Sequence, residues 1–69
     1  MDMDDATREI LRRLARTPMP TEYHRVANVR LAFGTSDVDV IARELPDIHF
    51  TPSDFAEINT FLDEHIFRT

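Results

Sequence analysis

Apolar residues recur along this chain at intervals of three and four, in four stretches separated by short polar or proline-containing segments. This spacing places side chains on one face of an α-helix, whose residues advance by about 100° each. The pattern predicts an all-α protein, a compact bundle of four short helices forming one domain over residues 1–69. The expected helices span about residues 4–16, 21–33, 36–45 and 52–67.

The last of these helices has the most complete set of local signals. Thr51 suits an N-cap, Pro52 suits the first helical position, and Asp54 stands where an acid can bond back to the cap. Phe50 and Phe55 flank this start as the two members of a hydrophobic staple. A short helix is unstable alone in water, so its apolar side is expected to pack on the other three helices. That side comprises Phe55, Ile58, Phe61, Leu62 and Ile66.

Prolines and the single glycine mark the limits of the other helices. Two prolines within residues 17–21 break the first helix, and Thr21 is expected to cap the second. Gly34 suits a left-handed position after the second helix. Ser36 is expected to cap the third helix, which Pro46 ends, and Asp4 or Asp5 the first.

Each of the three shorter helices is expected to bury an apolar face against the last one. These faces comprise Met3, Ala6, Ile10, Leu11, Leu14 and Ala15 in the first helix; Tyr23, Val26, Ala27, Val29, Leu31 and Phe33 in the second; and Val38, Ile41, Ala42 and Leu45 in the third.

An alternative stays open for the middle of the chain. Residues 29–33 alternate between apolar and polar side chains as a half-buried strand does, and residues 37–41 could return beside them as a second strand. This alternative is an α+β fold with a short hairpin around residues 28–41.

Opposite charges gather in the two halves of the chain. Residues 6–33 contain six Arg and two Glu, a net charge of +4, whereas residues 35–69 contain eight acids and two Arg, a net charge of −6. Packing of the halves would neutralise them, and the alternative is a two-signed surface that orients a charged partner. Arg8, Arg12 and Arg16 repeat every four residues and form one ridge, a candidate site for an acidic protein face or for phosphates.

Three further residues lie where the helical pattern does not expect them. Arg30 projects from the apolar arc of the second helix, where a lone buried guanidinium would be costly. The charge of Arg30 therefore has to be satisfied by water, by an acid from the C-terminal half, or by a partner. Val40 and Phe67 lie off the main apolar arcs. The candidate partner-binding residues are Arg8, Arg12, Arg16, Arg30, Val40 and Phe67.

Composition excludes several classes of function. The chain has no Cys and so no disulfide, and His24, His49 and His65 lack the spacing of a helical zinc site; neither a metal nor another cofactor is expected. One glycine is too few for a phosphate-binding loop, and no nucleophile motif is present, so no enzyme activity and no small-molecule substrate are expected. The acidic start and the absence of a long apolar run favour a cytoplasmic protein without a membrane span.

These features favour a small acidic protein-protein interaction module, a regulator or inhibitor that docks on another protein or forms a homodimer. In general outline, the second and third helices around Gly34 also resemble a helix-turn-helix, so a DNA-binding transcriptional regulator is the alternative. The expected reading helix has Arg43 as its sole base and exposes Asp37, Asp39 and Glu44. Acids repel phosphates, which places nucleic acid second as a partner.

Overall fold

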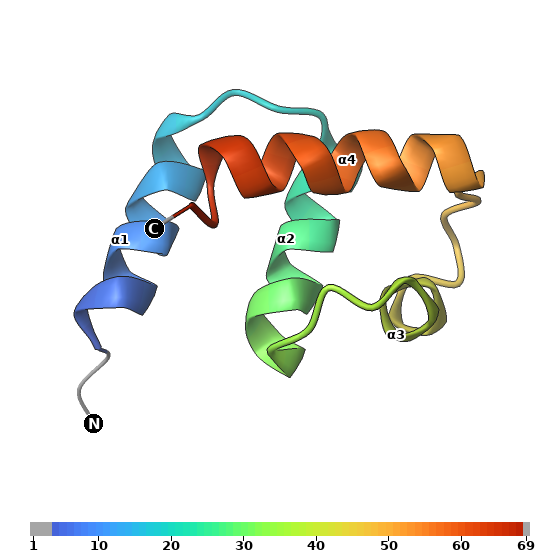
Figure 1. Ribbon diagram of the computed structural model, residues 1–69, viewed down its shortest axis with the longest axis horizontal. Coiled ribbons are helices and arrows are strands. Elements are labelled where there is room, and N and C mark those ends of the chain that lie inside the picture. The colour runs from blue at the N-terminus through green and yellow to red at the C-terminus, as the bar shows by residue number, and fades with distance from the viewer. Residues whose placement is uncertain (1–3, 69) are drawn as a thin grey trace.

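The computed structural model describes residues 4–68, and within them it has four helices and no strand. The helices are α1 (Asp5–Arg16), α2 (Thr21–Phe33), α3 (Val38–Glu44) and α4 (Pro52–His65). The all-α prediction is confirmed, and the α+β alternative is wrong because residues 28–33 belong to α2. In Figure 1, α4 runs from the α3 end of the molecule across the ends of α2 and α1. Met3, assigned to the first apolar face, lies outside the described residues.

The start of α4 has the predicted cap and staple, although residues 4–68 show no bond from the Asp54 carboxylate back to the cap residue. The Thr51 hydroxyl accepts the Asp54 N–H at 3.0 Å, and Pro52 is the first helical residue. The rings of Phe50 and Phe55 meet edge to face with centroids 5.8 Å apart, which confirms the staple. The chain therefore enters α4 at an angle fixed by a cap and a ring pair.

The end of α4 comes two residues earlier than expected. The N–H groups of Ile66 and Phe67 both donate to the carbonyl of Leu62, at 2.9 and 2.8 Å. This shared acceptor tightens the last turn and ends the regular helix at His65. Phe67 consequently leaves the helix and lies against α2 rather than continuing the α4 face.

Two predicted caps are wrong, because a neighbouring residue occupies the cap position in each case. Thr21 does not cap α2, because the extended Pro20 precedes it and the Pro20 carbonyl already accepts the first helical N–H groups. Ser36 does not cap α3, because the hydroxyl of Thr35 holds the Asp37 N–H at 3.0 Å and keeps Asp37 extended. Asp37 then caps α3 by accepting the Asp39 N–H. In both cases the residue that caps the helix is a neighbour of the one expected.

Two other helix limits agree with the sequence. Asp4 caps α1 by accepting the Thr7 N–H at 2.7 Å, and this bond lowers the pKa of the Asp4 carboxyl. Gly34 follows α2 with φ of 61°, in the left-handed region where a side chain would be strained.

One apolar core joins all four helices. α4 and the residue that follows it contribute almost half of its members, so the expected inward packing of this segment is confirmed. At the rim of the core, Tyr23 of α2 meets Phe61 of α4 edge to face, with ring centroids 5.3 Å apart. The buried residues are Leu14, Val26, Ala27, Ile41, Leu45, Phe55, Ile58, Leu62 and Ile66.

Three large residues assigned to buried faces are exposed instead. Leu11 is 39% exposed, Phe33 53% and Val38 45%. Leu11 lies at the edge of the α1 arc, beside the Arg ridge. Phe33 is the last residue of α2 and Val38 the first of α3, so no further turn of either helix packs beside them. Three small residues of the expected faces are exposed as well: Ala6, Ala15 and Ala42.

Packing brings the basic and acidic halves together at two places. Arg25 of α2 donates to both carboxylate oxygens of Asp47 at 2.6 and 3.0 Å, and Arg30 donates to Asp63 of α4 at 2.7 Å. The expected neutralisation therefore takes place, although it uses two of the Arg residues and leaves the ridge on α1 outside these pairs. None of the helices within residues 4–68 combines the length and apolar character required to cross a membrane.

We predict that Thr51→Ala and Phe50→Ala each lower the free energy of unfolding by about 1 kcal/mol or more, because they remove the cap and the staple of α4. Denaturant unfolding measures this loss. Ser53→Ala is the matched control, since Ser53 lies in the same turn and is not the capping residue, and it should change stability by less than about 0.5 kcal/mol. Wild-type stability in both test variants would contradict this start of α4.

The Arg25–Asp47 pair gives a prediction for pH. Hydrogen bonding from Arg25 holds the pKa of the Asp47 carboxyl below its ordinary value. A lowered folded-state pKa stabilises the fold above the ordinary carboxyl pKa, and this stabilisation is lost as the pH falls through the lowered value. In a carbon-13 NMR titration, Arg25→Gln should raise the Asp47 midpoint, whereas Arg43→Gln should leave it in place. An unchanged midpoint in Arg25→Gln would show that the pair does not form.

Candidate interaction site

The Arg ridge of α1, formed by Arg8, Arg12 and Arg16, is exposed as the sequence predicts. Arg12 and Arg16 are 62% and 71% exposed, and both approach Glu9, at 3.2 and 3.9 Å. Arg13 also approaches Glu9, at 3.6 Å. One carboxylate thus serves several guanidinium groups, and the outer face of α1 keeps a surplus of positive charge.

Arg30 lies inside the bundle rather than on its surface, with only 10% of its side chain exposed. It donates to the side-chain oxygen of Asn59 at 3.1 Å and to Asp63 at 2.7 Å. Its guanidinium carbon lies 4.2 Å from the centre of the Phe67 ring. The expected pairing with an acid of the C-terminal half is confirmed, and the structure brings together two candidate residues, Arg30 and Phe67.

Arg30 and Phe67 are part of the lining of an open groove of about 360 Å³, which we call the α1–α2 groove. One wall is Ile10 of α1, another is Leu31 of α2, and the turn after α2 closes one end. Arg30 is the only charged residue in this lining. The full set is Ile10, Arg30, Leu31, Gly34, Thr35, Ser36 and Phe67.

Arg13 fixes the C-terminal wall of the α1–α2 groove. Its guanidinium donates to the carbonyls of Ile66 and Arg68, at 3.0 and 2.7 Å, and so ties the segment around Phe67 to α1. The residue pattern gave no sign of this role for Arg13. Because every residue has a backbone carbonyl, the sequence could not indicate which carbonyls Arg13 would bond.

Val40 is not part of this groove. It is half-buried on α3, whereas Val38, which was expected to be buried, is the exposed valine of that helix. The shorter α3 starts at Val38 and turns Val40 partly toward its neighbours. The structure therefore joins Arg30 and Phe67 in one place, and leaves the Arg ridge and Val40 at others.

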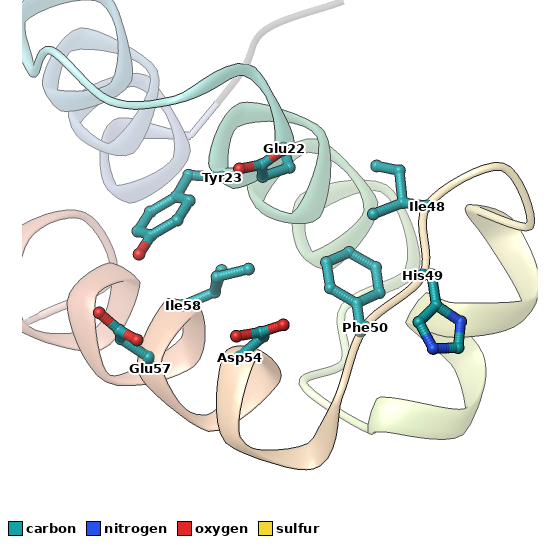
Figure 2. Close-up of a pocket in the computed structure, with 8 residues that line it drawn as sticks. All are labelled: Glu22, Tyr23, Ile48, His49, Phe50, Asp54, Glu57 and Ile58. Atoms are coloured by element: carbon teal, nitrogen blue, oxygen red, sulfur yellow. The ribbon is translucent and has the colours of Figure 1, made fainter.

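A second concavity has the opposite charge, and we call it the acidic cleft. It has a volume of about 260 Å³ and lies between the start of α2, the link before α4 and the first turns of α4. Figure 2 shows Glu22 on one side of the opening and Asp54 and Glu57 on the other. No ion pair engages these three carboxylates within residues 4–68. The remaining lining residues are Tyr23, Ile48, His49, Phe50 and Ile58.

Comparisons with protein-family models, with curated proteins and with solved structures find no match to this chain. Among the residues that the structure describes, no three His, Asp or Glu side chains are grouped so that they could hold a metal ion. What the chain binds must therefore be inferred from the chemistry of its concavities and its exposed faces.

The contacts of Arg30 predict that it matters more for stability than an exposed arginine does. Arg30→Ala should lower the free energy of unfolding by about 2 kcal/mol, because it removes two hydrogen bonds and the contact with the Phe67 ring. Arg12→Ala is the matched control and should cost about 0.5 kcal/mol or less, because its ion pair is exposed. Equal losses in thermal and denaturant unfolding would show that Arg30 is not held as described.

Proposed function

We propose that this chain is a small cytosolic protein-interaction module that regulates or inhibits a partner protein by binding it in the α1–α2 groove. The observation that carries the proposal is the convergence of Arg30 and Phe67, from distant parts of the chain, in the lining of one open groove. Arginine and aromatic residues are the types that most often dominate the affinity of protein interfaces.

The lining of the groove indicates what the partner presents. Ile10, Leu31 and Phe67 offer apolar surface, and Arg30 is the sole charge. A groove with this chemistry suits a segment with apolar side chains and a carboxylate, and an amphipathic helix is the common form of such a segment. Phe33, half exposed and directly before Gly34, adds an aromatic ring at the same end of α2.

Binding rather than catalysis is the proposed activity. The groove contains two hydroxyl side chains, Thr35 and Ser36, but no acid or histidine in its lining to activate them. The Thr35 hydroxyl already accepts the Asp37 N–H. A partner segment, held by contacts over the groove, fits this chemistry better than a reacting small molecule does.

DNA binding is the second candidate, and the Arg ridge on α1 favours it. The helix that would enter the major groove is α3, which has only seven residues and exposed acids at both ends, Asp37, Asp39 and Glu44. These acids oppose close approach to phosphates. Retention on duplex DNA that falls with rising salt, and that weakens in Arg12→Ala, would support DNA binding over the protein partner.

The groove is tested by capture of partners from native lysate with three baits: wild type, Ser36→Glu and Ser53→Glu. Ser36→Glu adds a carboxylate to the groove and should repel an acidic partner, while Ser53→Glu makes the same change at the start of α4, outside the groove. We expect a protein captured by wild type and by Ser53→Glu that is lost with Ser36→Glu.

Capture by itself is not support, because any exposed surface can retain a protein. Equal capture by all three baits would place the interaction elsewhere on the molecule. An absence of captured protein with the folded wild-type bait would contradict the proposal. Circular dichroism of each bait shows whether its helices are intact, so that loss of binding is not confused with loss of the fold.

A further inference from the structure

Charge is separated along the longest dimension of the molecule. The described chain measures 35 × 23 × 19 Å, and Figure 1 shows α1 at one end of the long axis and α3 with the start of α4 at the other. The Arg ridge lies on α1, and the acidic cleft begins at the α4 start. The internal ion pairs of Arg25 and Arg30 leave this separation in place, because neither involves α1 or the cleft carboxylates.

The chemistry of the acidic cleft suits a group that has both apolar surface and a positive charge. Its floor includes Phe50 and Ile58, and Tyr23 lies at its side. Three carboxylates stand around this floor without cationic partners among residues 4–68. A cation that enters would gain both ion pairs and contact with the aromatic rings.

The outer face of α1 has the complementary composition. Arg12 and Arg16 lie four residues apart on this face and extend their guanidinium groups mostly into solvent. A helix face with several arginines matches a cleft with three acids in charge, and the methylene stems of the arginines match its apolar floor. The same chain therefore carries both halves of one interface.

We propose that the acidic cleft binds the outer face of α1 from a second copy of this chain. Two copies placed side by side in opposite directions bring the α1 end of each next to the cleft end of the other. This arrangement forms a two-fold dimer with two identical contacts, the commonest symmetry for protein assemblies. In each contact, Arg12 and Arg16 meet the cleft carboxylates, and the methylene stems of these two side chains cover the apolar floor.

The dimer uses surfaces that are separate from the α1–α2 groove. A failed test of the dimer would therefore leave the proposed function intact, and a failed test of the proposed function would leave the dimer intact. The dimer also predicts a distinctive response to salt. Each chain has a net charge of −5. If repulsion between these net charges limited association, added salt would screen the repulsion and strengthen the dimer. Opposite charges in direct contact give the reverse, and we expect rising salt to weaken the dimer.

Sedimentation of wild type and two charge reversals tests the proposal. Wild type should show a concentration-dependent mass that approaches two chains at millimolar concentration. Arg12→Glu and Glu57→Arg should each weaken self-association on the order of tenfold or more, because both contacts then join like charges. Glu64→Arg is the matched control: it reverses another acid of α4, outside the cleft, and should dimerise at least as well as wild type.

The decisive measurement is a mixture of Arg12→Glu with Glu57→Arg. In the mixed pair, one contact joins the two substituted side chains and the other joins the two native ones, so both contacts regain opposite charges. The mixture should form dimers at concentrations where each variant alone is monomeric, a result that misfolding of either variant cannot produce. A monomeric wild type, open-ended growth, or a mixture that stays monomeric would overturn the proposal.

Discussion

Burial of the apolar side of α4 is the interaction on which the rest of the fold depends. All four helices are short, and a chain of this length buries only about 60% of its unfolded surface, so each helix depends on packing against the others. Phe55, Ile58, Leu62 and the following Ile66 are each buried, and each contributes about 2 kcal/mol by leaving water. These contacts hold α4 against α2, and α2 in turn packs on α3.

The same arrangement determines where charge can accumulate. Where α4 meets α2, Asp63 lies within reach of Arg30, and the guanidinium is paired rather than exposed. The outer face of α1 and the start of α4 take no part in this pair, and they keep charges of opposite sign.

The two concavities follow from how the helices are joined. Arg13 holds the C-terminal segment against α1, and the gap that remains beside α2 becomes a groove with a single cation. The link before α4 brings Phe50 into its staple and leaves three carboxylates around an apolar floor. One small bundle thus presents one concave surface whose sole charged lining residue is Arg30 and another that three carboxylates surround.

Local physics made much of this predictable from the residues alone. The cap at Thr51, the staple, the left-handed Gly34 and the inward face of α4 each depend on residues close together in the chain. Pairing of Arg30 with a C-terminal acid was one of three possibilities that the sequence left open, because water or a partner could also satisfy a guanidinium in an apolar arc. The caps at Thr21 and Ser36 were predicted wrongly, because a neighbouring residue takes the cap position in each case.

The sequence by itself determined that four helices form, roughly where they start and stop, and that the last must pack on the others. Only the tertiary structure decided that Phe33 and Val38 are exposed, that Phe67 turns back onto Arg30, and that Ile10 and Leu31 become walls of a groove. Helical periodicity shows which side of a helix is apolar, but how much of that side is covered depends on the lengths and crossings of its neighbours.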